Sequence, residues 1–264
     1  MPVQRRTIDR KRSDLVESMA NSARRIALAY WRRALNIESK ADATPVTIAD
    51  RAIENKLRSM IAEAEPTAAI FGEEFGADTT VAAQSDLWIL DPIDGTGAFV
   101  TGSPLFGTLI GLVANGAPVL GVIEAPALGE RWTAQHGEGA FLNGKRCATS
   151  GVVNLSEAAL GSTSPMTFSD EERMKFSELS GRVALTRFGG DCYAYALVAS
   201  GHLDLVVEAG LQPYDYLPLV TVLEEAGGVI TDWSGAPLTL NSGGRVVASA
   251  SRPLHAQALE ILNT

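Results

Sequence analysis

The amino-acid sequence predicts an α/β fold, because helical and strand-like hydrophobic patterns occupy different parts of one chain. Apolar residues recur at helical spacing near the N-terminus, short apolar runs with turn signals fill the middle, and both patterns alternate beyond Gly151. With 264 residues, 46% of them hydrophobic, the chain is long enough for a sizeable core. We expect either one large α/β unit or two closely packed subdomains, 1–150 and 151–264.

Two amphipathic helices are predicted in the N-terminal region. The first covers residues 13–33, where apolar side chains recur at near-helical spacing between arginines. The second begins near Thr47, because Thr47-Ile48-Ala49-Asp50 matches the pattern of a capping threonine followed three residues later by an acid. The buried face of this second helix is expected to carry Ile53, Leu57, Met60 and Ile61.

The region from about 86 to 150 is predicted to be mostly sheet. Trp88-Ile89-Leu90 indicates a strand that stops at Asp91, since Pro92 would interrupt a ladder of hydrogen bonds. Asn115-Gly116 is a typical hairpin turn between strands over 105–113 and 118–123, and Asn143-Gly144 repeats the signal. Further along, the patterns predict helices over 191–200, 215–226 and 256–262, and strands over 203–207 and 246–249.

The charge and composition argue against several classes of protein. A net charge of −9 disfavours a general nucleic-acid or anionic-membrane surface, because both partners require a basic face. No apolar run approaches the roughly 18 residues of a membrane span, and the basic start lacks the apolar segment of a secretory signal. Two cysteines, Cys147 and Cys192, are too few for a disulfide framework. We therefore expect a soluble, cytoplasmic protein.

The motif Asp91-Pro92-Ile93-Asp94-Gly95-Thr96 places two acids in a turn just after an apolar strand. Two carboxylates held close together as anions require a compensating cation or a shared proton. Mg²⁺ suits such a site, because it prefers hard oxygen ligands and retains bound waters. The alternative is that both aspartates are ordinary turn residues, and the hexapeptide alone does not separate the two interpretations.

Three further acidic segments favour the metal site. Gly72-Glu73-Glu74 lies upstream, Asp50 lies in the first turn of a predicted helix, and Asp215 opens another helix after Pro213-Tyr214. Taken singly, Asp50 and Asp215 are explained as helix caps, because an acid at a helix N-terminus accepts hydrogen bonds from unpaired amides. Only their combination with the hexapeptide indicates a site.

This combination of motifs resembles the inositol monophosphatase family, which is related in fold to fructose-1,6-bisphosphatase. The resemblance runs from about Ser13 to the C-terminus, and it is carried by residues 91–99 and 215–228. Two departures are mild: Gly97-Ala98 stands where the family often has Thr-Asn, and Tyr214 stands where tryptophan is usual. The resemblance implies a layered αβαβα sandwich, a homodimer, and metal-assisted attack of water on a phosphate monoester.

The resemblance also implies roles for individual residues. Two or three Mg²⁺ ions would share the predicted ligands Glu73, Asp91, the Ile93 carbonyl, Asp94 and Asp215. Glu74 or Thr96 would position the attacking water, with Asp50 beside them. The amides of Gly95 and Thr96 would hold phosphate oxygens if they begin a helix. The predicted substrate-binding residues are Gly95, Thr96, Asp191, Glu208 and Asp215.

Within the family, the segments 187–195 and 201–208 look most like histidinol-phosphate phosphatases. Relatives acting on inositol phosphates more often carry a small or hydroxyl residue at the position of Asp191, whereas an acid suits a substrate with an ammonium group. The alternative is that Asp191 simply caps the helix that it begins. Inositol 1-phosphate or another small phosphate ester remains the second choice of substrate. A regulatory homologue that binds metal and phosphate without turnover is the alternative class.

Overall fold

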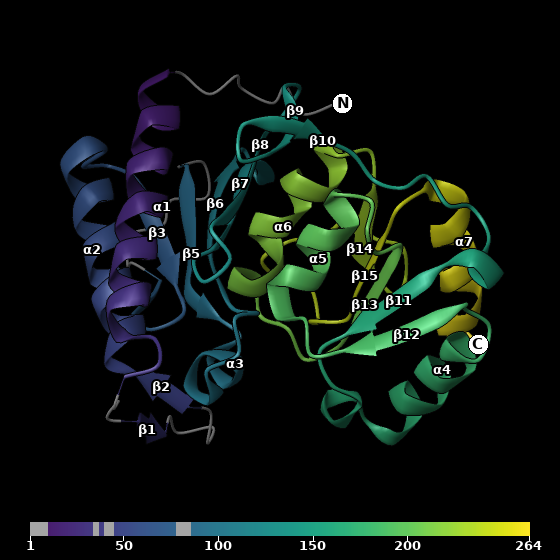
Figure 1. The fold of residues 1–264 in the computed structure, drawn as a ribbon. Coiled ribbons are helices and arrows are strands. Elements are labelled where there is room, and N and C mark those ends of the chain that lie inside the picture. The colour runs from purple at the N-terminus through teal and green to yellow at the C-terminus, as the bar shows by residue number, and fades with distance from the viewer. Residues whose placement is uncertain (1–9, 34–36, 40–44, 78–85) are drawn as a thin grey trace.

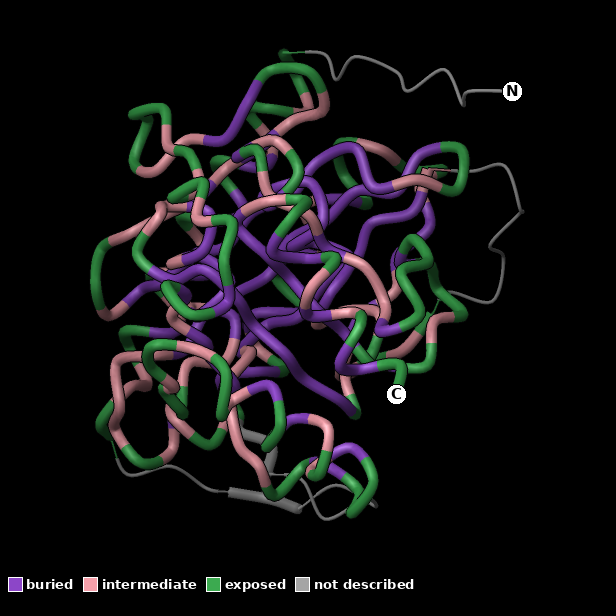
Figure 2. The backbone as a smooth tube through the Cα atoms, turned by 90° about the vertical axis from the view of Figure 1, so that its right-hand side faces the viewer, coloured by how far each residue is buried: buried purple, intermediate pink, exposed green. Residues whose placement is uncertain are grey.

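The computed structural model describes residues 10–33, 37–39, 45–77 and 86–264, and gives only the backbone for 37–39 and 45–47. Figure 1 shows five layers: two N-terminal helices, a large sheet, two helices, a smaller sheet and two outer helices. This arrangement confirms the predicted αβαβα sandwich. Figure 2 shows that the buried segments run through the middle of the molecule, while the exposed ones lie at its periphery.

Helices α1 (Arg10–Tyr30) and α2 (Ile48–Ala64) form the first layer. Their apolar faces pack on one side of the large sheet, as both predicted helical periodicities require. Met19, Ile53, Leu57 and Ile61 are fully buried in this core. The predicted cap at Thr47 lies outside the described side chains, since only the backbone of that residue is given.

The large sheet has eight strands in the order β10-β9-β8-β7-β6-β5-β3-β4. Its bounds are β3 (Ala69–Gly72), β4 (Gly76–Ala77), β5 (Leu87–Asp94), β6 (Gly107–Ala114), β7 (Ala117–Ala125), β8 (Glu130–Gln135), β9 (Gly139–Leu142) and β10 (Lys145–Cys147). Both predicted hairpins are confirmed. Asn115 and Gly116 have φ of 53° and 77°, and Asn143 and Gly144 have φ of 48° and 76°. Strands β1 (Ile37–Ser39) and β2 (Pro45–Thr47) form a separate antiparallel pair, and β2 contacts α2 and α3.

The prediction that the strand ends at Asp91 is wrong, because β5 continues through Pro92 to Asp94. The strand tolerates the proline at a β-bulge: Asp91 pairs with Leu109, whereas Asp94 pairs with Gly107. One extra residue is thus accommodated in β5 between the two aspartates. The carbonyl oxygen of Pro92 in this bulge still has a hydrogen-bond partner, since Thr108 Oγ1 donates to it at 2.7 Å.

The smaller sheet has five strands in the order β12-β11-β13-β15-β14. Its bounds are β11 (Ala159–Ser162), β12 (Leu185–Phe188), β13 (Leu205–Glu208), β14 (Val229–Asp232) and β15 (Val246–Ser249). Its outer face packs on α4 (Asp170–Ser180) and α7 (Arg252–Leu262) in a third core. Two short 3-10 helices, η1 (Leu155–Glu157) and η2 (Pro165–Thr167), lie before and after β11. None of the described helices is long and apolar enough to cross a membrane.

Helices α5 (Asp191–Ala199) and α6 (Pro213–Glu225) form the layer between the two sheets (Figure 1). Helix α6 approaches the large sheet closely, because Gly111 and Gly121 present no side chain to it. A Cβ on Gly121 would lie 2.1 Å from the Pro218 carbonyl oxygen, and one on Gly111 would lie 3.1 Å from Pro218 Cα. This close approach brings the first turn of α6, with Asp215, toward the end of β5.

Each half of the chain supplies one of the two larger sheets, and the change falls between β10 and β11. Helix α6, however, comes from the second half and packs on β6 and β7 of the first sheet. The central core accordingly mixes residues from both halves. A division into subdomains at residue 150 stays a prediction.

Candidate metal and phosphate site

Three predicted ligands, Asp91, Asp94 and Asp215, converge at the end of β5. One carboxylate oxygen from each lies within 4.8 Å of the others. Residues three apart on a regular strand face opposite sides of the sheet, so Asp91 and Asp94 would normally diverge. The bulge at Pro92 inserts one residue between them and thereby lets both carboxylates point to the same side. The bulge is therefore the local cause of the site.

A second group of acids, Asp50, Glu73 and Glu74, has carboxylate oxygens within 4.8 Å of one another. Strands β3 and β5 are parallel neighbours, so the residues that follow β3 lie at the same sheet edge as Asp91. The Glu73 amide donates to the Leu90 carbonyl at 3.1 Å, which fixes this register. The structure thus brings the upstream acidic segment beside the hexapeptide, as the prediction of one shared site requires.

The local electrostatics favour a bound cation. Burial raises the pKa of Asp91, and the charges of Glu73, Asp94 and Asp215 raise it further. Burial and then the charges of Asp191 and Asp215 raise the pKa of Asp94, and burial raises the pKa of Asp215 to about 7. Carboxylates that repel one another in a buried site are stabilised as anions by a divalent cation.

The hydrogen bonds of these acids leave oxygen atoms for such a cation. Asp94 Oδ2 accepts from the Cys192 amide at 2.5 Å, and Asp215 Oδ2 accepts from the Gln212 amide at 2.7 Å. Asp91 Oδ1 is buried and accepts no hydrogen bond from any described residue. An orphaned carboxylate oxygen among hard oxygen donors fits an ion such as Mg²⁺. Asp215 also caps α6, so the capping and ligand interpretations of this residue are compatible.

The residues after the bulge include Gly95 and Thr96, whose amides are the predicted donors to phosphate oxygens. Gly95 is the N-cap of the short helix α3 (Thr96–Thr101) and has φ of 79°, a conformation that favours glycine. A Cβ on Gly95 would lie 3.1 Å from the Asp191 carboxylate. Thr96 Oγ1 donates to the Ile93 carbonyl at 3.0 Å. The predicted start of a helix at Thr96 is thereby confirmed, and glycine permits the chain to pass close to Asp191.

A cavity of about 130 Å³ adjoins the acids and is lined by Asp94, Asp215, Thr163, Asp191 and Glu208. Asp191 begins α5 with φ of 43°, an uncommon value for a residue other than glycine. The N-cap of α5 is Gly190, and the first two amides of α5 donate to other side chains, that of Asp191 to Thr163 Oγ1 and that of Cys192 to Asp94 Oδ2. The alternative interpretation of Asp191 as a helix cap is therefore wrong. Burial raises the pKa of Asp191 to about 6.

Glu208 faces the same cavity but is held by neighbours that the sequence did not indicate. Its Oε1 accepts from the Thr163 amide at 2.8 Å and the Thr163 hydroxyl at 2.5 Å, and its Oε2 accepts from the Tyr195 hydroxyl at 3.1 Å. Burial raises the pKa of Glu208 to about 7. Thr163 Oγ1 also accepts from the Asp191 amide at 3.1 Å, so Thr163 links both predicted substrate-binding acids.

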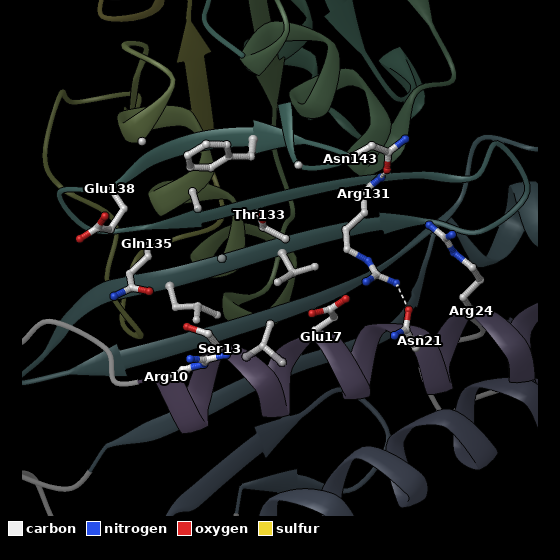
Figure 3. Close-up of a pocket in the computed structure, with 18 residues that line it drawn as sticks. Arg10, Ser13, Glu17, Asn21, Arg24, Arg131, Thr133, Gln135, Glu138 and Asn143 are labelled. Atoms are coloured by element: carbon white, nitrogen blue, oxygen red, sulfur yellow. Dashed lines mark hydrogen bonds between the residues drawn. The ribbon is translucent and has the colours of Figure 1, made fainter. Parts of the chain in front are cut away.

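A larger groove of about 800 Å³ lies away from these acids, between α1 and strands β7 to β9 (Figure 3). Two arginines in its wall have partners that the structure describes. Arg24 and Arg131 both bind the fully buried Glu124, and Arg131 Nη2 donates to Asn21 Oδ1 at 2.7 Å. The groove shares no residue with the smaller cavity.

Comparisons with known proteins agree with the fold and the motifs. Bifunctional phosphatase IMPL2, chloroplastic, of Arabidopsis thaliana is 43% identical over 252 residues, which cover 93% of this chain and 73% of the relative. A histidinol-phosphatase of Chlorobaculum parvum is 38% identical over 243 residues, which cover 89% of this chain and 91% of the relative.

A solved structure of an inositol monophosphatase from Zymomonas mobilis has a TM-score of 0.88 and 40% identity, and the match covers 97% of this chain and 100% of that chain. The model of the inositol monophosphatase family matches residues 11–264, a span that contains every candidate site residue. This chain therefore belongs to the inositol monophosphatase family.

Proposed function

We propose that the protein hydrolyses phosphate monoesters with the help of Mg²⁺ and that L-histidinol phosphate is its preferred substrate. The observation that carries the proposal is the convergence of Asp91, Asp94 and Asp215 beside a small cavity that holds two more acids, Asp191 and Glu208. The first three acids suit metal ions. The other two suit a cation on the substrate.

Bound Mg²⁺ would supply Lewis acidity to phosphoryl oxygens and lower the pKa of a bound water. The residues that would hold two or three ions are Glu73, Asp91, Asp94, Asp215 and the carbonyl of Ile93. That carbonyl accepts one hydrogen bond from Thr96 and has a second lone pair for an ion.

The other site residues would orient water and phosphate. The Thr96 hydroxyl donates its hydrogen bond to the Ile93 carbonyl, so its oxygen lone pairs are available to accept a hydrogen bond from a water molecule. Glu74, next to Asp50, is the second group suited to hold this water. The amides of Gly95 and Thr96 begin α3 and would donate to phosphate oxygens. Each of these roles orients a reactant, which is how positioning lowers the barrier to phosphoryl transfer.

The preference for histidinol phosphate rests on charge. Identities of 38% to a histidinol-phosphatase and 40% to an inositol monophosphatase do not discriminate between the two esters. Asp191 supports histidinol phosphate, because a carboxylate that is partly removed from water is stabilised by a positive partner, and the ammonium group of histidinol would supply one. Inositol 1-phosphate, which offers only hydroxyl groups there, is the second candidate.

A panel of phosphate esters tests the function directly. The purified protein is assayed on histidinol phosphate, inositol 1-phosphate and p-nitrophenyl phosphate, with Mg²⁺ and with excess EDTA. We expect hydrolysis only with Mg²⁺ and the highest kcat/KM on histidinol phosphate. Turnover in EDTA contradicts the metal-dependent mechanism, and a preference for inositol 1-phosphate contradicts the substrate. Metal binding without hydrolysis of any ester would favour a regulatory homologue.

We also propose that the protein is cytoplasmic, as its composition suggests, and a homodimer, as the family resemblance implies. Sedimentation equilibrium at micromolar concentration is expected to give twice the chain mass of 27.9 kDa. A single species at the chain mass would contradict the dimer.

A further inference from the structure

Glu54 is a fully buried acid that belongs to neither predicted group of metal ligands. It lies on α2, one helical turn after Asp50. Its Oε2 accepts from the Glu74 amide at 2.7 Å, and its Oε1 accepts from the Phe75 amide at 3.2 Å and from Arg58 Nε at 2.8 Å. Both carboxylate oxygens are therefore engaged by donors of the protein itself.

The turn that Glu54 holds is the one from which Glu73 and Glu74 project. Arg58 strengthens this attachment, because its Nη2 donates to the Gly76 carbonyl at the far end of the turn. On the other side, the Glu73 amide donates to the Leu90 carbonyl of β5. The turn is thus tied to α2 on one side and to the strand that carries Asp91 on the other.

Gly72 shows how closely the Glu54 carboxylate approaches the turn. A Cβ at this position would lie 2.1 Å from Glu54 Oε1 and 2.4 Å from its Cδ, well inside van der Waals contact. Both atoms belong to a side chain that cannot move away without breaking its amide hydrogen bonds. The glycine in Gly72-Glu73-Glu74 is therefore explained by the room that Glu54 requires.

We propose that Glu54 is a positioning residue that sets the affinity of the site for Mg²⁺ through the turn 73–76. The inference rests on the proposed function, in which Glu73 binds the ions and Glu74 holds the water. Glu54 binds no ion itself. Its two amide contacts fix the backbone from which Glu73 and Glu74 reach the site, and groups that orient metal ligands typically change metal affinity by about ten- to a hundredfold when replaced.

Glu54→Gln is the decisive variant, because it keeps the size of the side chain and removes one acceptor and the charge that faces Arg58. We expect Mg²⁺ binding to the substrate-free protein, measured by isothermal titration calorimetry, to weaken about ten- to a hundredfold. The Mg²⁺ concentration for half-maximal activity should rise by the same factor. At saturating Mg²⁺, KM for the ester should stay within about twofold, because Glu54 does not line the substrate cavity.

Glu172→Gln is the matched control. Glu172 also accepts a backbone amide, that of Ser169 at 2.8 Å, and pairs with an arginine, Arg245 at 2.6 Å, but it lies on α4 in the other half of the chain. We expect this variant to lower the melting temperature while Mg²⁺ binding stays unchanged. A general loss of stability would weaken Mg²⁺ binding in both variants alike and so contradict a specific role of Glu54.

Gly72→Ala tests the same contact from the opposite side, since the new Cβ displaces the carboxylate. We expect weaker Mg²⁺ binding in this variant, and a combined Glu54→Gln, Gly72→Ala protein that loses less than the product of the two single losses. Wild-type Mg²⁺ affinity in both single variants, with only the melting temperature lowered, would overturn the inference and leave the proposed function intact. A wild-type protein that binds no Mg²⁺ would overturn both.

Discussion

Asp94→Asn should lower kcat/KM for phosphate esters by several orders of magnitude, and Asp91→Asn should do the same. A neutral amide binds a divalent cation far more weakly than a carboxylate does. Both aspartates share the group with Asp215, so the loss of either removes one of three converging charges. Steady-state kinetics across a range of Mg²⁺ concentrations measures the effect. An Asp94→Asn enzyme with wild-type activity would contradict the mechanism.

The same substitution at Asp91 should stabilise the metal-free protein. Burial and neighbouring carboxylates raise the pKa of Asp91, so the folded state favours its neutral form. Without metal, stability therefore falls as pH rises from the ordinary carboxyl range toward this raised pKa. Asparagine removes that penalty at neutral pH, and we expect the melting temperature in EDTA to rise by several degrees.

With Mg²⁺ present, we expect Asp91→Asn to lower the melting temperature relative to the wild type. Mg²⁺ stabilises the wild-type protein by binding only its folded state, and Asp91→Asn loses most of that gain. Melting curves of both proteins with and without Mg²⁺ give the test. Asp170→Asn is the control for a lost negative charge, because the Asp170 side chain is 96% exposed and belongs to neither group of converging acids. A lower melting temperature for Asp91→Asn in EDTA would show that Asp91 stabilises the fold by itself.

Local sequence patterns predicted the elements well because turns and caps are encoded over a few residues. Asn115-Gly116 and Asn143-Gly144 both form the predicted hairpins, since asparagine and glycine adopt the positive φ that the turn requires. The strand over 246–249 has the predicted bounds. The end of β5 was missed because a proline that interrupts a regular ladder is equally compatible with a bulge.

The contacts that support the site are long-range, and no local pattern encodes them. The Cys192 amide reaches Asp94 across 98 positions, and Thr163 reaches Glu208 across 45. No motif in the sequence assigns a role to Glu54, although its place one helical turn after Asp50 indicates that it shares a helix face with that residue. The proposed metal ligands are recognisable in the sequence only through a family resemblance that combines distant motifs.

Asp191→Asn should lower kcat/KM on histidinol phosphate by roughly ten- to a hundredfold, because a charge-assisted contact is worth about 1.5–3 kcal/mol. Asp191 is free of a capping role and lines the small cavity beside Asp94. Its carboxylate is thus available to the ammonium or imidazole group of the substrate. Once Mg²⁺ neutralises the ligands, Asp191 and Glu208 are the acids of this cavity that still need a cation.

Glu208→Gln should produce a loss of similar size by a partly different route. Its carboxylate already accepts hydrogen bonds from Thr163 and Tyr195, and Thr163 in turn accepts from the Asp191 amide. Glutamine removes the charge and one of these acceptors, so it weakens the substrate contact and also loosens the link to Asp191.

Comparing an ester that carries a cationic group with one that carries none separates substrate recognition from catalysis. On p-nitrophenyl phosphate, which carries no ammonium or imidazole group, both variants should retain most of the wild-type kcat/KM, whereas on histidinol phosphate they should not. Asp170→Asn again controls for net charge and should leave both esters unaffected. Equal losses on both esters would mean that Asp191 and Glu208 support the metal site or the fold. Losses confined to histidinol phosphate would identify both acids as the groups that bind its cationic group, because only that substrate loses an interaction made in the transition state.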